Sequence, residues 1–251
     1  MKKIALLAAV TFYSCANSHE KVTLFNGKDL TGWDTYIKAT GTNNDPDKVF
    51  SVVDIEGDQV MKISGEHFAG ISTVDEYANY HLVLQFKWGE AKYAPKLNDK
   101  RDSGLLYHAV GEQGGDGGAW MKSQEFQVEE GNTGDYWGVA GGSFDIPVIR
   151  KDSTHFVYDP KGEMLTFVDG GPVDRHAIKY PDAENPSGQW NTLELYCLGD
   201  SAIHVVNGVV VMRLYNSNYT KGKIQLQSEG AEVYYRKLEL EKINAIPETL
   251  K

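Results

Sequence analysis

The chain alternates apolar and polar residues most regularly in the stretch His81-Leu82-Val83-Leu84-Gln85-Phe86-Lys87-Trp88. Positions 82, 84 and 86 are apolar, whereas positions 85 and 87 carry Gln and Lys. Successive side chains of a β-strand point to opposite faces, so a period of two predicts a strand with one buried face and one polar face. Residues 192–197 repeat this pattern, with apolar residues at 193, 195 and 197.

A tight hairpin is predicted at Val205-Val206-Asn207-Gly208-Val209-Val210. Asn-Gly supplies the two positive-φ residues of a type I′ turn, and β-branched residues flank it on both sides. Further short strands are predicted at Val49–Ile55, Val60–Ser64, Gly104–His108, Glu125–Glu129, Leu165–Val168, Ile224–Gln227 and Val233–Leu240. No long helical period and no internal repeat is found. We therefore expect an all-β fold, a two-sheet antiparallel β-sandwich or jelly roll, with the outer face of one sheet open to a ligand.

The charge of the chain narrows the class of ligand. Its 251 residues include 35 Asp and Glu against 25 Lys and Arg, a net charge of −10, and the basic residues form no cluster. Such a protein repels phosphate backbones and anionic membrane surfaces, so nucleic acid is not expected as a partner. A neutral ligand such as a sugar is compatible with this charge.

The N-terminus has the pattern of an export signal. Lys2 and Lys3 precede the apolar run 4–10, and Phe12-Tyr13-Ser14-Cys15 resembles a bacterial lipoprotein cleavage box. We expect residues 1–14 to be a signal peptide, Cys15 to be lipidated, residues 16–20 to be a tether and residues 21–251 to form one β-sandwich domain. The protein would then be a lipoprotein of the cell envelope (periplasm or outer membrane), held to the membrane by its lipid anchor only. Plain secretion is the alternative, because Phe12 stands where leucine is usual.

Cys197, on the apolar face of its strand, is expected to be buried and to form no disulfide.

Long loops interrupt the strand pattern. Two are rich in glycine, at Gly111–Gly118 and Asn132–Gly142, and a third, at Pro172–Pro186, is polar and punctuated by proline. Loops of this size are uncommon in compact domains and are often functional. Three aromatic residues, Trp120, Tyr136 and Trp137, lie in or beside them. These side chains either stack on the apolar face of a sugar ring or fasten the loops to the body of the protein.

The segment Ser123–Gly131 carries the first candidate site. In a strand, Glu125, Gln127 and Glu129 project from one face, and the two apolar residues between them project from the other. Carboxylates placed near each other raise one another's pKa, which suits one of them to acid–base chemistry. The alternative is an ordinary solvated sheet face.

Other titratable residues extend this candidate site. Asp102 and His108 have the same parity in a second strand, so the imidazole is a candidate acid, base or hydrogen-bond donor. Arg236 has the parity of Leu238 and Leu240, which predicts a half-buried guanidinium that is more often structural. Glu130 and Glu229 remain candidates for its partner or for the site.

Several motifs that occur in order over residues 24–243, nearly the whole mature chain, point to one known family. The first is the stretch Leu24-Phe25-Asn26-Gly27-Lys28-Asp29-Leu30-Thr31-Gly32-Trp33. It resembles the opening motif of the 3-keto-disaccharide hydrolase family, which is fairly specific. Later motifs follow in the family's order, namely Asp102-Ser103-Gly104, Glu125-Phe126-Gln127, Gly188-Gln189-Trp190-Asn191, His204 with Asn207-Gly208, Gln227-Ser228-Glu229-Gly230 and Tyr235-Arg236. Asp102 departs from the asparagine usual in the family, as does the long loop after His108. The resemblance implies a concanavalin A-like jelly roll that acts on sugars already oxidised to a ketone.

The resemblance also implies a mechanism and roles for the candidate residues. A ketone at ring position 3 acidifies the C–H bond at position 2, so a base can remove that proton and the glycosidic oxygen can leave position 1. Water then adds back, and the net reaction is hydrolysis. We expect Glu125 to be a general acid or base, His108 to assist it and Gln127 to orient the substrate. The substrate-binding candidates are Asp102, Glu129, Glu130, Trp120, Tyr136, Trp137 and Arg236, and the expected partner is an oxidised disaccharide or glycoside.

Two other functions stay open at this point. A retaining glycosidase needs carboxyls about 5–5.5 Å apart, whereas residues four apart on a strand, such as Glu125 and Glu129, have α-carbons about 13 Å apart. Gln127 also stands where such enzymes of this fold carry an aspartate. The third reading is a lipoprotein that binds glycans without catalysis. No cofactor is certain, and a divalent cation held by His108 and acidic neighbours is the one metal site considered, to stabilise an enolate.

Overall fold

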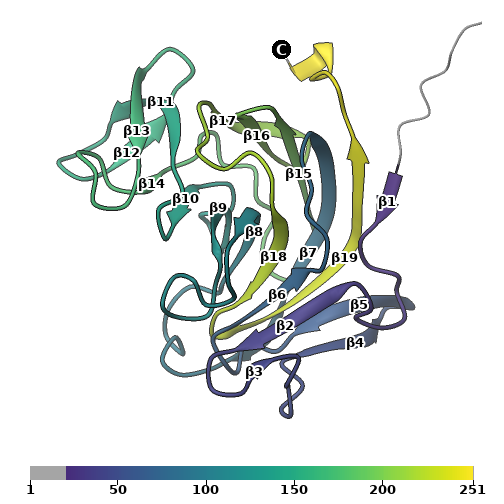
Figure 1. Ribbon diagram of the computed structural model, residues 1–251. Coiled ribbons are helices and arrows are strands. Elements are labelled where there is room, and N and C mark those ends of the chain that lie inside the picture. The colour runs from purple at the N-terminus through teal and green to yellow at the C-terminus, as the bar shows by residue number, and fades with distance from the viewer. Residues whose placement is uncertain (1–20, 251) are drawn as a thin grey trace, which may run out of the picture.

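The computed structural model describes residues 21–250, which form two eight-stranded antiparallel sheets packed face to face and a three-stranded sheet to one side (Figure 1). The first sheet consists of β1 (Lys21–Thr23), β4 (Phe50–Ile55), β5 (Asp58–Ile63), β7 (Tyr80–Lys92), β15 (Asn191–Leu198), β16 (Ser201–Val206), β17 (Val209–Leu214) and β19 (Ala231–Lys242). The second sheet consists of β2 (Trp33–Ile37), β3 (Gly41–Thr42), β6 (Ala69–Thr73), β8 (Asp102–Val110), β9 (Lys122–Glu129), β10 (Tyr136–Val139), β14 (His176–Ala177) and β18 (Lys223–Ser228). The third sheet consists of β11 (Phe144–Arg150), β12 (Phe156–Tyr158) and β13 (Glu163–Phe167). The predicted all-β sandwich is confirmed.

Strand β7 shows why the alternating stretches form strands. Its residues Leu82, Leu84 and Phe86 are fully buried between the sheets, whereas the residues between them are half-buried on the outer face. β7 pairs with β15 on one side and with β19 on the other, so its backbone hydrogen-bonding groups are satisfied by neighbouring strands. The alternation with a period of two therefore corresponds to a central strand whose sheet has one face in the core and one outer face.

The predicted hairpin is confirmed as the turn between β16 and β17. Asn207 and Gly208 have φ values of 49° and 80°, both positive as a type I′ turn requires. Cys197 is buried, as expected. Its expected lack of a disulfide stays a prediction, because Cys15 lies outside the described residues.

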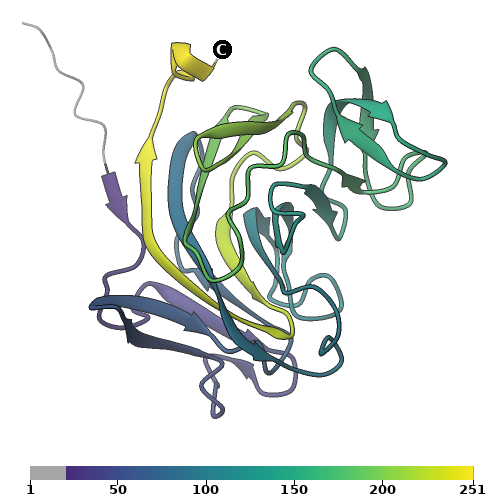
Figure 2. The same cartoon turned by 180° about the vertical axis from the view of Figure 1, so that it is seen from behind.

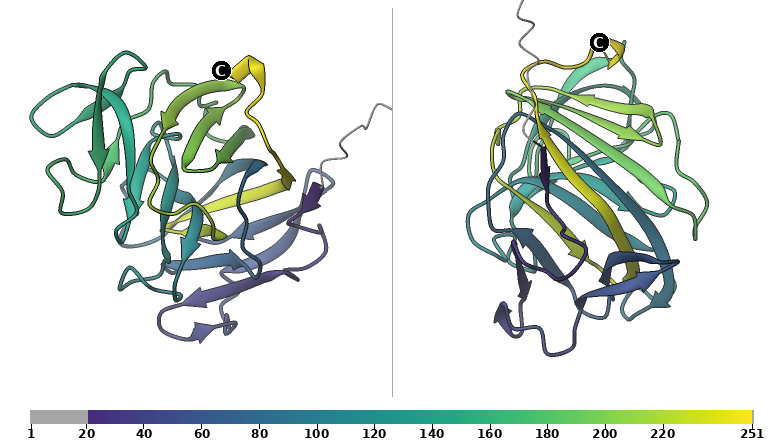
Figure 3. Two further views of the ribbon diagram at one scale, coloured as in Figure 1. Left: turned by 45° about the horizontal axis from the view of Figure 1, so that its top comes forward. Right: turned by 90° about the vertical axis from the view of Figure 1, so that its right-hand side faces the viewer.

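Alternation missed several short strands between residues 132 and 186. Long loops were expected there on either side of a strand at Leu165–Val168, which β13 confirms, but the region also contains β10, β11, β12 and β14. β10 has only four residues, one of them Gly138, and β11 contains Pro147, which has no N–H to donate. Such strands carry almost no periodic signal. The third sheet stands apart from the sandwich in Figure 2 and in the left view of Figure 3.

The expectations for the leader, namely the signal peptide 1–14, the lipidated Cys15 and the tether 16–20, lie outside the described residues and stay predictions. Within residues 21–250, no helix has the length and apolar character needed to cross a membrane.

Candidate functional site

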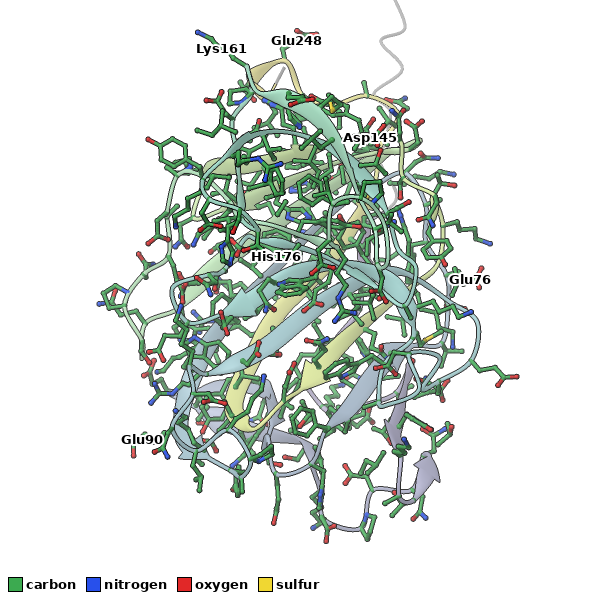
Figure 4. The ribbon with its side chains drawn as sticks, turned by 90° about the vertical axis from the view of Figure 1, so that its left-hand side faces the viewer. Glu76, Glu90, Asp145, Lys161, His176 and Glu248 are labelled. Carbon is green, nitrogen blue, oxygen red and sulfur yellow. The ribbon has the colours of Figure 1, made fainter. Side chains whose placement is uncertain are left out.

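A cavity of about 470 Å³ lies on the outer face of the second sheet, which faces away from the first sheet. Figure 4 looks onto this face, with His176 near its middle. Strands β8, β9 and β10 form the floor of the cavity, together with the end of β18, and loops before β8, before β9 and before β14 form its walls. This volume is typical of a pocket for a small molecule.

Glu125 is the central group of the floor. The pleat of β9 places its side chain in the cavity, while Phe126 and Val128 point into the core between the sheets, as the sequence predicted. The residue is only 6% exposed. Burial raises the pKa of Glu125 well above its ordinary value, and the nearby carboxylates of Glu229 and Asp102 raise it further. This shift favours the protonated form of Glu125, which can donate a proton.

Gly104 creates the space that Glu125 occupies. A β-carbon at this position would overlap Oε1 of Glu125 and Oε1 of Gln227, because both side chains lie over the glycine. Their positions thus depend on the absence of a side chain in the neighbouring strand β8.

We expect Gly104→Ala to displace the carboxyl of Glu125 and to lower turnover by about 10²-fold, since a misplacement of about 1 Å can cost that much. Both overlapped atoms are the ends of flexible side chains, so the fold should accommodate the methyl group and the melting temperature should change little. Steady-state kinetics and thermal unfolding of the same preparation check this. Loss of activity only in proportion to loss of folded protein would contradict it.

Three charged residues form a cluster beside Glu125, namely Lys96, Asp102 and Glu229. The ammonium of Lys96 donates to Asp102 Oδ2 and, at 2.6 Å, to Glu229 Oε1. The two carboxyls also share a hydrogen bond. Ionised carboxylates only accept, so this bond forms only when one of the two carboxyls carries a proton.

The pKa values of this cluster follow from burial and from the neighbouring charges. Burial raises the pKa of Asp102 to about 7, assisted by the Glu229 charge and opposed by Lys96. Burial likewise raises the pKa of Glu229, and Lys96 opposes it. Burial lowers the pKa of Lys96, but the two carboxylates outweigh this effect and hold its pKa above the ordinary value. Near neutral pH the cluster holds one firm positive charge and two carboxyls that can exchange a proton.

Two of the three aromatic candidates, both tryptophans, line the cavity, whereas the third, Tyr136, does not. Trp120 and Trp137 both border the cavity. Trp137 is held in place because the His176 ring stacks on it at 4.1 Å and His176 Nε2 lies 2.9 Å from Asp135 Oδ2. Tyr136 instead points into the core, where its hydroxyl donates to Gln124 Oε1 at 2.6 Å.

The remaining acidic and amide candidates, two in β9 and Glu130 directly after it, lie outside the cavity lining. The Gln127 Oε1 accepts a hydrogen bond from the backbone N–H of Val128 at 3.1 Å. Glu129 pairs in register with Asp102 and accepts a hydrogen bond from Asn132. Glu130 forms a double hydrogen bond with Arg101, at 3.1 and 3.2 Å.

His108 is not brought to Glu125, so its expected position is wrong. A β-bulge interrupts the pairing of β8 and β9 after Tyr107, and His108 has a φ of 49°. The extra residue reverses the facing of the strand, and the imidazole packs edge-on to Tyr80 and Tyr107 in the interior. There Nδ1 donates to the Tyr219 carbonyl at 2.8 Å, and burial lowers the pKa of His108 to about 4.

Arg236 is also misplaced by the parity prediction, for the same physical reason. A bulge at Lys237, whose φ is 53°, separates Arg236 from the core residues that follow it. The guanidinium lies on the outer face of the first sheet, where it donates to Gln85 and Asp58 and lies 3.9 Å from the Trp190 ring centroid. Its structural pairing is confirmed, whereas its placement in the site is not.

A divalent cation does not fit the residues proposed for it. Among residues 21–250, no group of three or more His, Cys, Asp or Glu side chains is arranged to hold a metal ion. His108 Nε2 faces the interior without a partner, and its neighbours are aromatic rings.

Sequence reasoning missed five residues that line the cavity, namely Lys96, Asp116, Asp169, Arg175 and Gln227. Gln227 was detectable, because it alternates with the core residues Ile224 and Leu226 of β18. The other four lie in loops. A loop has no periodic pattern from which the direction of its side chains could be predicted.

Comparison with known proteins gives one matching family and several similar structures. A family model described as 3-keto-alpha-glucoside-1,2-lyase-like domain matches residues 20–241. Two Parabacteroides distasonis proteins, each provisionally named a glycosyl hydrolase, have similar crystal structures. Their TM-scores are 0.55 and 0.53 at 18% and 17% identity, over 89% of this chain and 94% and 100% of theirs. The carbohydrate-binding module CBM66 from Bacillus subtilis has a TM-score of 0.51 at 8% identity, over 84% of this chain and 96% of that one. No curated protein matches the chain.

Proposed function

Because this chain belongs to the family of 3-keto-alpha-glucoside-1,2-lyase-like domains, we propose that it cleaves the glycosidic bond of sugars whose ring carries a ketone at position 3. Family membership indicates a glycosyl hydrolase-like protein that acts on carbohydrates. The oxidised substrate and the elimination route are the proposal.

The reaction needs one base and one acid. The base removes the proton at C2, and the electrons of that bond form an enolate whose negative charge rests on the C3 oxygen. The enolate then expels the oxygen at C1, which takes a proton from the acid and leaves as an alcohol. Water adds across the resulting C1=C2 bond, with its oxygen at C1 and its hydrogen at C2, so the overall reaction is hydrolysis.

The carboxyls of the cavity can supply both groups. Burial raises the pKa of Glu125 and so favours its protonated form, which suits it to protonate the leaving oxygen. Asp102 and Glu229 share a hydrogen bond and the ammonium of Lys96, so this pair can exist as a monoanion that accepts the C2 proton. The single observation that carries the proposal is the buried carboxyl of Glu125 in one cavity with a carboxyl pair that is bound by a lysine. Trp120 and Trp137 offer apolar faces for the sugar ring.

The pH dependence of kcat/KM is expected to be bell-shaped. The rate should rise with pH until enough protons have left the Asp102–Glu229 pair for one carboxylate to act as the base, near the raised Asp102 pKa of about 7. It should fall again at higher pH, where Glu125 loses the proton that it donates. Initial rates at low substrate between pH 4 and 10 test this. A profile that is already flat at pH 5 would contradict the assignment of the pair as base.

The function itself is tested by turnover of a small panel of glycosides, each offered unmodified and oxidised at C3, with products identified by mass. We expect cleavage of the oxidised members only. Equal cleavage of unmodified members would instead identify an ordinary glycosidase. Binding without turnover of any member would identify a glycan-binding protein.

A further inference from the structure

Two cationic side chains line the cavity, and their surroundings differ. Lys96 donates to Asp102 and to Glu229, so both carboxyls of the cluster use its charge. Arg175 lies on the opposite side, at the end of the loop before β14. Its guanidinium forms no ion pair and no hydrogen bond with any residue from 21 to 250. The guanidinium carbon lies 5.5 Å from the centroid of the Trp137 ring.

The backbone holds Arg175 in this position. Its N–H donates to Asp174 Oδ1 at 2.8 Å, and its carbonyl accepts the N–H of Gly138 in β10 at 2.9 Å. Neighbouring His176 stacks on the same tryptophan and is close to the buried carboxylate of Asp135. The backbone of Arg175 is therefore fixed directly before β14. Replacing the Arg175 side chain should leave these backbone hydrogen bonds intact.

An unpaired guanidinium in this cavity is unusual, because the lining also contains five carboxyl side chains, Asp102, Asp116, Glu125, Asp169 and Glu229. Arg175 is near enough to Glu125 for its charge to affect that group. Guanidinium presents five N–H donors in a rigid fork and accepts no hydrogen bond. Donors that no protein group occupies are available to an oxygen of the substrate.

We propose that Arg175 is a catalytic residue that donates hydrogen bonds to the C3 oxygen of the substrate and stabilises the enolate. This inference rests on the proposed function. When the base takes the C2 proton, the electrons of the C–H bond form C2=C3, and those of the carbonyl π bond move to the C3 oxygen. The negative charge on that oxygen then lies against the guanidinium. When the bond from C1 to the leaving oxygen breaks, the carbonyl at C3 is restored. The negative charge then passes from the C3 oxygen beside Arg175 to the leaving oxygen, which the acid protonates.

The enolisation step can be measured separately from bond cleavage. The 3-keto derivative of 1,5-anhydroglucitol has an acidic C2–H but no glycosidic oxygen at C1, so in D2O its enolate exchanges hydrogen for deuterium without cleavage of a glycosidic bond. We would follow this exchange by NMR, and cleavage of a 3-keto glucoside by mass, for the full chain and for Arg175→Gln and Arg175→Lys. Arg150→Gln is the matched control, because Arg150 also lies over an aromatic ring, 4.6 Å from the centroid of Phe156, but in the third sheet outside the cavity lining.

For Arg175→Gln we expect both exchange and cleavage to fall by about 10²–10³-fold, the usual loss when one donor to an oxyanion is removed. Arg175→Lys should recover part of both rates, since it keeps the charge but loses the fork, and Arg150→Gln should match the unmodified protein.

Exchange at the unmodified rate in Arg175→Gln would overturn the role of Arg175 while leaving the proposed function standing. If selective loss of binding for substrates with a carboxylate accompanies that result, Arg175 recognises an anionic substituent instead. If the unmodified protein neither exchanges nor cleaves, the proposed function itself fails. Circular dichroism and thermal unfolding identify a variant that is misfolded, and Arg175→Lys then carries the test.

Discussion

Replacing Glu125 by Gln is expected to lower the turnover of a 3-keto glycoside with an alkyl aglycone by about 10³-fold, within the range of general acid catalysis. The amide keeps the size of the side chain but has no acidic proton for the departing oxygen. An aglycone such as 4-nitrophenol needs no such proton, so its 3-keto glucoside should lose far less activity. Steady-state kinetics with the two substrates measures the difference.

Glu130→Gln is the control for this experiment. Glu130 lies in the same part of the chain but pairs with Arg101 outside the cavity lining, so its replacement should leave kcat unchanged. An equal loss with both aglycones in Glu125→Gln would show that Glu125 acts as the base or positions the substrate. Exchange of the C2 hydrogen in the variant then separates these two roles, because only loss of the base stops exchange.

Replacing Lys96 by Met should have the largest effect on stability, and the effect should grow with pH. In the unfolded chain the carboxyls of Asp102 and Glu229 titrate near 4, whereas burial raises both pKa values in the folded protein and Lys96 opposes that rise. Without the lysine, both folded-state pKa values rise further. A carboxyl with a higher pKa in the folded state binds more protons when folded, so stability falls as pH rises between the unfolded and the folded pKa.

We therefore expect the free energy of unfolding of Lys96→Met to be little changed near pH 4 and to be lower by on the order of 3 kcal/mol at pH 8, as for a buried charge cluster that loses one partner. Denaturant unfolding at the two pH values measures this. Lys21→Met is the control, because its ion pair with Glu239 is exposed and contributes at most about 1 kcal/mol. The acid limb of the pH–rate profile should also move to higher pH. An equal loss of stability at both pH values would contradict the role given to Lys96.

Alternation predicted the direction of side chains wherever a strand is regular. In β7 and β9 every second residue is in the core, so the buried faces and the outward direction of Glu125 were both accessible from the sequence. The prediction failed at His108 and Arg236, where one extra residue reverses the alternation. Such a bulge depends on the partner strand, which the local sequence does not specify.

The cavity itself depended on contacts between distant parts of the chain. Lys96, Asp102 and Glu229 come from a loop, from β8 and from the residue after β18, and they meet because β8 pairs with β18. Arg175 reaches the cavity because β14 pairs with β10, two short strands without a periodic signal. No spacing in the sequence relates these residues.

By itself, the sequence determined the all-β fold, the two-residue turn at Asn207-Gly208, the core faces of the long strands and the outward position of Glu125, since all of these follow from backbone geometry over a few neighbouring residues. Only the tertiary structure decided which carboxyls are buried together, which lysine neutralises them and which arginine remains unpaired. The physical reason is that burial and electrostatic interaction act through space, so they depend on strand pairing between residues that are far apart in the sequence.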